Sequence, residues 1–149
     1  MKRKSLTQDA CPVARSLDVL GDWWTLLIVR DALHGACRFS DFQKRLGMAK
    51  NILSSRLQHL VEEGVFETRP SPERADRHEY HLTEKGRRLQ LVLFALRQWG
   101  EDHLFEPGEE MTLLLDKQNN APVQRLELRS EAGHTLGPGD LHVRQGQKQ

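Results

Sequence analysis

The sequence predicts an α+β fold that is mainly helical. Three observations lead to this class. Apolar residues recur at helical spacing over most of residues 11–104, and glycines and capping residues interrupt them. One charged segment, RPSPERADRHEY at residues 69–80, lies between VFET and YHLT, which both have the composition of short strands. After Phe105 two strand-like stretches, MTLLLD and VQRLELR, surround the turn DKQNNAP.

Composition and charge are those of a protein of about one domain. The chain has 149 residues, of which 29% are charged, and its net charge is +1. That charge is unevenly distributed: residues 38–97 hold 12 Lys/Arg against 8 Asp/Glu, whereas residues 98–120 hold one Lys against six acids. The basic middle of the chain favours a polyanionic partner, although solvated charge is the commoner explanation when nothing else agrees.

Four helices are expected before the charged hairpin. Residues 11–21 form the first, and residues 22–35 form the second, which has Asp22 as its N-cap and is apolar on most sides, as a helix in the core is. Ser40 and Gln43 form a capping-box pattern for a short third helix that ends at Gly47. Residues 49–63 form the fourth. Its apolar face consists of Leu53, Leu57, Leu60 and Val61.

The third and fourth helices, joined by a short turn, make a helix-turn-helix. A helix fits the major groove of DNA, and Asn51 and Gln58 on the outward face of residues 49–63 carry the amide fork that pairs with adenine. When this helix is considered alone, a solvated polar face is the commoner explanation. The candidate DNA-contacting residues on it are Lys50, Asn51, Ser55, Arg56, Gln58 and His59.

The hairpin at residues 69–80 makes this unit a winged helix. A hairpin turn needs only two residues, so the long basic tip has another purpose. Arg74 and Arg77 suit contact with phosphates or with a narrow minor groove, where negative potential is concentrated. Most arginine-rich loops are simply solvated, and acids in the tip partly cancel these charges. The order of the elements, a helix-turn-helix followed directly by a basic hairpin, favours DNA contact over a solvated loop.

The last helix, residues 84–104, is capped by Thr83 and is apolar on more than one face. A second subunit is the usual partner of such a helix. We therefore expect residues 1–105 to form a winged-helix DNA-binding and dimerisation domain. Residues 106–149 are expected to form a small β-type appendage with a flexible end.

This ordered set of motifs resembles the HxlR-type transcriptional regulators, which are relatives of the MarR winged-helix group. The resemblance spans residues 11–105 and implies a homodimer, most often a repressor, that binds a palindromic operator and is joined through its first and last helices. It also places Ser54 on the recognition helix and Arg38 at the DNA backbone. Some relatives have a cysteine-bearing, ribbon-like tail after the last helix; the tail of this chain looks similar in outline but has no cysteine. The matching stretches are CPVARSLDVLGDWWTLLIVRDALHGACRFSDFQ, NILSSRLQHLVEEGVFE, HEYHLTEKG and ALRQWG.

Two kinds of signal remain open. Cys11 lies just before a helix, where the helix dipole can make a thiol reactive, and several HxlR-type proteins sense oxidants with a cysteine at the matching place. Cys37 is a candidate disulfide partner across a dimer. The ordinary alternative is that Cys11 is a small buried hydrophobic residue and that Cys37 has no role in sensing. A small-molecule effector is the other option. The aromatic residues that would line its pocket, or simply fill the core, are Trp23, Trp24, Phe94 and Trp99.

No catalytic arrangement, cofactor motif or metal site is predicted. The seven histidines are scattered, and the spacing of His78 and His81 puts them on opposite faces of a strand. The rival to a DNA-binding regulator is a winged helix that binds proteins, against which the basic wing argues. The basic N-terminus has no apolar run behind it and the longest apolar stretch is LLIV, so we expect a cytoplasmic protein with no membrane segment.

Overall fold

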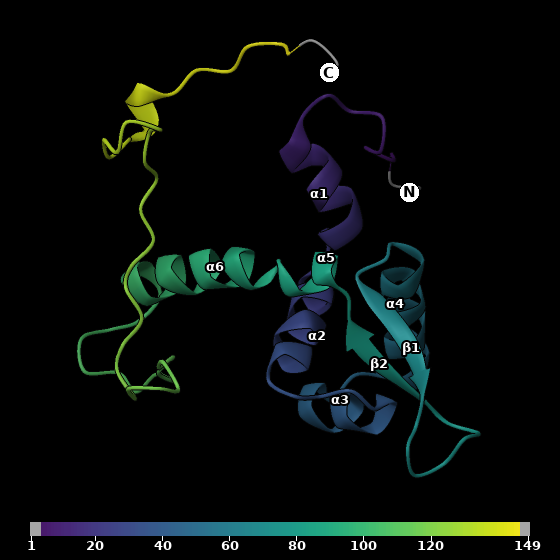
Figure 1. The fold of residues 1–149 in the computed structure, drawn as a ribbon. Helices are drawn as coiled ribbons and strands as arrows, with labels where there is room; N and C mark the ends of the chain where they lie inside the picture. The colour runs from purple at the N-terminus through teal and green to yellow at the C-terminus, as the bar shows by residue number, and fades with distance from the viewer. Residues whose placement is uncertain (1–3, 147–149) are drawn as a thin grey trace. The chain divides into compact units, whose positions relative to one another are not determined.

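The computed structural model describes residues 4–146, which belong to two compact units, Met1–Phe94 and Ala95–Gln149. The first unit is the mainly helical winged helix-turn-helix that the sequence predicts (Figure 1). The last long helix begins in the first unit and ends in the second. The elements are α1 (Pro12–Leu20), α2 (Trp23–Leu33), α3 (Phe39–Leu46), α4 (Lys50–Glu62), β1 (Phe66–Pro70), β2 (His78–Leu82), α5 (Glu84–Arg87), α6 (Gln90–His103) and the short 3-10 helix η1 (Pro138–Asp140).

Side-chain caps set where several helices begin. The carboxylate of Asp22 accepts hydrogen bonds from the backbone N of Thr25 at 3.0 Å and from its hydroxyl at 2.9 Å, as predicted for the start of α2. The prediction that Ser40 caps the third helix is wrong. Because α3 begins at Phe39, Ser40 already lies inside it, and the carboxylate of Asp41 reaches back to accept from the backbone N of Arg38 at 3.0 Å.

The core of the first unit joins the helices to the base of the wing. Phe42 of α3 meets Phe66 of β1 edge to face, with ring centroids 6.1 Å apart, and Phe66 meets Tyr80 of β2 in the same way at 6.5 Å. Trp23 is 71% exposed, so α2 is less enclosed than its composition predicts. The buried apolar residues are Ile28, Val29, Ala36, Phe42, Met48, Leu53, Leu57, Leu60, Val65 and Phe66.

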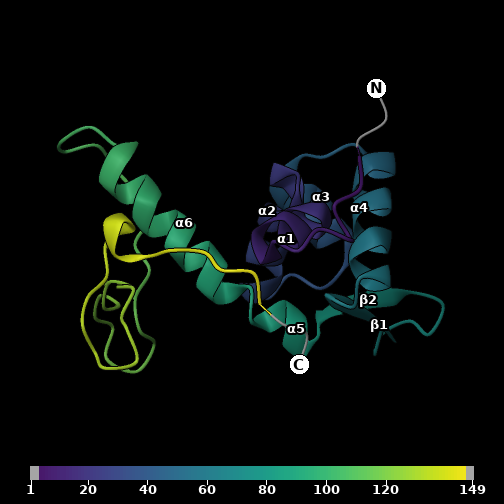
Figure 2. The same cartoon turned by 90° about the horizontal axis from the view of Figure 1, so that it is seen from above.

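Strands β1 and β2 pair antiparallel, in a register that places Phe66 opposite Leu82 and Pro70 opposite His78. The backbone N of Ser71 donates to the carbonyl of Arg77 at 2.7 Å, which closes the neck of the loop. Beyond this bond the tip extends past the strands (Figures 1 and 2). The expected wing is therefore present.

The single helix predicted over residues 84–104 is wrong, because the structure divides it into α5 and α6. The backbone N of Leu89 bonds to the carbonyl of Gly86 at 3.1 Å, an i→i−3 bond that interrupts the α-helical pattern. Thr83 caps α5 as predicted, since its hydroxyl accepts from the backbone N of Gly86 at 3.1 Å.

In the second unit the two strands predicted at residues 111–116 and 123–129 are reduced to isolated bridges. Leu115 bridges to Pro122, and Arg129 bridges to Thr135. The apolar residues of these two stretches do not pack in a sheet within the described residues; Leu113, for example, is 74% exposed. The domain boundary after residue 105 stays a prediction. Among the described helices, none has the length and apolarity needed to cross a membrane.

Candidate nucleic-acid interface

Helix α4 has one buried face and one exposed polar face. Leu53, Leu57 and Leu60 are buried in the core, as the helical periodicity predicts. The opposite face is open to solvent, and there the amide nitrogen of Gln58 donates to the carboxylate of Glu62 at 3.2 Å. A helix presented in this way leaves polar side chains available to base edges. The predicted residues on the exposed face are Lys50, Asn51, Ser54, Ser55 and Gln58.

The other two residues predicted on this helix contact the protein itself. The guanidinium Nε of Arg56 lies 3.2 Å from the carboxylate of Asp22, which also caps α2. The ring Nε2 of His59 lies 3.2 Å from the backbone carbonyl of Val19 in α1. Both side chains therefore connect α4 to the first two helices.

A cavity of about 300 Å³ and another of about 560 Å³ are found in the first unit. The larger lies between the start of α3, the start of α4 and the wing, and we call it the basic groove. Arg38, Lys50, Arg74 and Arg77, four of the residues predicted from the sequence to contact DNA, line it together. The other lining residues, which the sequence did not indicate, are Phe39, Ser40, Gln43, Ser71, Glu73, His78 and Tyr80.

Acidic side chains form ion pairs with two of the four cations of the basic groove. Nη2 of Arg38 lies 2.9 Å from Oε1 of Glu73, and this hydrogen bond raises the pKa of Arg38 above its ordinary value. Arg74 pairs with Asp76 at 3.0 Å. Within the described residues, the side chains of Lys50 and Arg77 have no acidic partner. The groove thus offers two cations immediately, and each of the other two becomes available when its own exposed ion pair opens.

The two cysteines lie in different surroundings. Cys11 is exposed and occupies the N-cap position of α1. Cys37 is half-buried in the loop between α2 and α3, and its pKa is raised by burial and, to a lesser extent, by the nearby carboxylates of Glu79 and Asp41. A raised pKa keeps Cys37 in its less reactive thiol form, so Cys11 is the better candidate for a reactive thiol.

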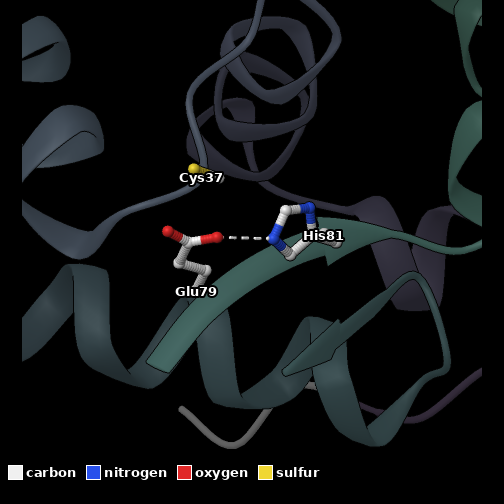
Figure 3. Close-up of side chains that lie close together, drawn as sticks. All are labelled: Cys37, Glu79 and His81. Atoms are coloured by element: carbon white, nitrogen blue, oxygen red, sulfur yellow. Dashed lines mark hydrogen bonds and ion pairs between the residues drawn. The ribbon is translucent and has the colours of Figure 1, made fainter. Parts of the chain in front are cut away.

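Neither cavity of the first unit is lined by the predicted aromatic residues. Trp23 and Trp24 contact each other instead, with ring centroids 4.7 Å apart. The smaller cavity adjoins Cys37 and His81, and Figure 3 shows these two side chains together with Glu79. On the sequence alone, His81 is considered as a metal ligand only together with His78. In the structure, Glu79 and His81 lie on the same face of β2.

The winged helix-turn-helix has known counterparts. The sequence pattern of the HxlR-like helix-turn-helix family matches residues 19–107. The chain belongs to this family. Rv3095, an HTH-type transcriptional regulator of Mycobacterium tuberculosis, is 45% identical to this HxlR-like chain over 95 residues, which cover 64% of this chain and 60% of Rv3095. The HTH-type regulator YodB of Bacillus subtilis is 33% identical over 101 residues, which cover 66% of this chain and 89% of YodB.

Solved structures agree with this assignment. The crystal structure of PA1607, described as a candidate transcription factor, has a TM-score of 0.90 and 49% identity, covering 96% of this chain and all of PA1607. A MarR-family protein of Porphyromonas gingivalis has a TM-score of 0.57 at 22% identity, covering 69% of this chain and 99% of its own, and it shows a shared fold alone. The HxlR-like chain therefore belongs to a family of HTH-type transcriptional regulators, and it spans about 60% of the length of the mycobacterial relatives it matches.

Proposed function

We propose that this HxlR-like chain is a homodimeric repressor that binds a palindromic operator in double-stranded DNA. The single observation that carries the proposal is the basic groove, where Arg38, Lys50, Arg74 and Arg77 converge beside the exposed face of α4. Such a groove suits a phosphate backbone that passes between a recognition helix and a wing.

The two parts of the interface have different tasks in this proposal. Asn51 and Gln58 on α4 read base edges in the major groove, where their amide groups match adenine. The cations of the basic groove bind phosphates, which adds affinity and fixes the register of the helix but reads no sequence. Arg77, at the end of the wing loop, can bind a phosphate without first breaking an ion pair, as can Lys50.

Exposed apolar residues on two helices support a dimer. Val13 and Leu17 of α1 are 65% and 51% exposed, and Leu96 and Trp99 of α6 are 51% and 58% exposed. No residue of α1 or α6 is buried within the chain. Helices with such faces are usually covered by a partner, and a second copy of the chain would also supply the second recognition helix for a palindrome.

The proposed function is tested by titrating the full-length protein into a labelled DNA fragment from upstream of its own gene. A shuffled fragment of the same composition serves as the control, and both are measured at several salt concentrations. Tight, salt-sensitive binding to the natural fragment alone is the expected result. Equal or absent binding to both fragments would favour the protein-binding winged helix instead.

A second proposal concerns the signal: oxidation of Cys11 releases the DNA. Cys11 is exposed at a helix N-terminus. YodB has been crystallised reduced, treated with diamide and with quinone bound, and the related HypR is described as a redox regulator. Diamide should abolish operator binding by the natural protein but not by Cys11→Ser. Binding that ignores oxidants would point to a small-molecule effector.

A further inference from the structure

Three side chains of different chemistry meet beside the smaller cavity. The ligand atoms of Cys37, Glu79 and His81 all lie within 4.8 Å of one another (Figure 3). Glu79 and His81 are two residues apart on β2, so they point to the same face of the strand. Cys37 approaches them from the loop between α2 and α3. No sequence pattern associates Cys37 with the wing.

The backbone already holds these residues in place. The backbone N of Tyr80, between the two strand residues, donates to the carbonyl of Cys37 at 2.7 Å. The backbone N of Cys37 in turn donates to the carboxylate of Asp41 at 3.3 Å. The first bond therefore fixes the loop to the strand between Glu79 and His81, and the second fixes the loop to the first turn of α3.

The donor set is one that a transition metal prefers. A thiolate, an imidazole nitrogen and a carboxylate oxygen are all common zinc ligands, whereas Mg²⁺ and Ca²⁺ take oxygen donors. With Zn–ligand bonds of about 2.0–2.3 Å, tetrahedral ligand atoms lie roughly 3.5 Å apart. The present separations, all within 4.8 Å, would have to shorten toward this value when a metal binds.

Charge and burial also favour a cation here. Glu79 is only 8% exposed, although it is ionisable. Its carboxylate bonds to Nε2 of His81 at 2.9 Å, and its other oxygen lies 3.7 Å from Nε of Arg38. A buried carboxylate with one distant cation and one histidine has a charge that a bound metal would compensate.

We propose that Cys37, Glu79 and His81 form a binding site for one divalent transition-metal ion such as Zn²⁺. Binding replaces the Sγ proton of Cys37 with a metal–sulfur bond, and that proton passes to the solvent. The hydrogen bond between His81 and Glu79 gives way to two metal–ligand bonds, and the neutral imidazole of His81 keeps its proton on Nδ1. The adjoining cavity of about 300 Å³ leaves room for a water as the fourth ligand.

This site would connect the helix-turn-helix to the wing. Cys37 lies two residues before the start of α3, and Glu79 and His81 belong to the strand that leads out of the wing. The metal would also draw Glu79 away from Arg38, which lines the basic groove. The binding of the metal itself does not depend on whether the chain binds DNA.

The test uses the full chain, freed of metal and of any histidine tag. Calorimetric titration with Zn²⁺ is expected to give one equivalent per chain, with release of protons to the buffer. Co²⁺ is expected to give the intense thiolate-to-cobalt charge-transfer band of a sulfur-bound site. Cys37→Ser and His81→Gln should weaken Zn²⁺ binding by at least about tenfold. The matched controls, Cys11→Ser and His78→Gln, should bind within about twofold of the natural protein.

Any one of three results would overturn the proposal. These are the absence of Zn²⁺ binding by the natural protein, the absence of the charge-transfer band in its Co²⁺ complex, and equal Zn²⁺ affinity in all four variants. Circular dichroism shows whether each variant is folded. Should a variant unfold, protection of Cys37 from alkylation by bound Zn²⁺ in the natural protein supports the site, and unchanged alkylation of Cys37 counts against it.

Discussion

The carboxylate of Glu73, in the wing loop, lies 2.9 Å from the guanidinium of Arg38, the residue just before α3. Both residues line the basic groove. A phosphate that enters this groove must therefore compete with Glu73 for Arg38, and the acid also repels the phosphate directly.

Removing this acid should strengthen DNA binding. Glu73→Gln is expected to raise the affinity for any duplex roughly two- to fivefold, because an exposed ion pair contributes little and its loss frees Arg38. Fluorescence anisotropy with a shuffled duplex measures the effect. Glu127→Gln, which removes an acid paired with Arg129 in the second unit, is the matched control and should leave the affinity unchanged. Equal gains in both variants would mean that net charge alone is responsible.

Substitutions on the exposed face of α4 should change sequence preference. Asn51→Ala and Gln58→Ala are each expected to reduce the preference for the operator by about 1–3 kcal/mol, while affinity for shuffled DNA and the salt dependence stay the same. Competition between operator and shuffled duplexes measures this preference. Gln90→Ala, at an exposed position of α6, is the control. A uniform loss of affinity for both duplexes would assign these residues to the phosphate backbone.

The apolar face of α6 should be needed for assembly. Leu96→Glu is expected to convert the dimer to a monomer, because it places a charge in an interface that excludes water. Gln90→Glu adds the same charge at an exposed polar position of the same helix and should leave the dimer intact. Sedimentation velocity distinguishes the two states. A dimer that survives Leu96→Glu would place the interface elsewhere.

Two helical glycines should respond in opposite ways to alanine. A Cβ added at Gly86 would lie 2.2 Å from the carbonyl oxygen of Val65, so Gly86→Ala should lower the free energy of unfolding by about 1–3 kcal/mol or more. At Gly100 the nearest atom, Cδ1 of Leu104, is 4.0 Å away, and Gly100→Ala should leave stability equal or raise it by up to about 1 kcal/mol. Urea denaturation measures both. Similar values for the two variants would contradict the close packing of α5 on the carbonyl of Val65.

Local chemistry made much of the first unit predictable from sequence. Asp22 and Thr83 carry their capping role in the side chain, and Leu53, Leu57 and Leu60 repeat at the helical period. The basic residues of the groove could also be found, since Arg74 and Arg77 lie in a segment whose length and charge are unusual for a turn.

Features that depend on tertiary contacts were not predictable. Periodicity placed Arg56 and His59 near the outward face of α4, but the approach of α1 and α2 engages both side chains. Cys37 lies 42 residues before Glu79, and only the packing of the α2–α3 loop on β2 brings them together. The strands predicted after Phe105 failed for the same reason, because strand formation depends on pairing with a neighbour.

The central claim is that the basic groove binds the DNA backbone, and the salt dependence of DNA binding by Arg77→Ala tests it most directly. Arg88→Ala removes the same charge from the C-cap of α5, outside the groove, and serves as the control. The account predicts that Arg77→Ala weakens binding to operator and shuffled DNA alike and lowers the slope of log K against log salt by about 1, whereas Arg88→Ala keeps the natural slope. An unchanged slope in Arg77→Ala, or the same decrease in both variants, would contradict it.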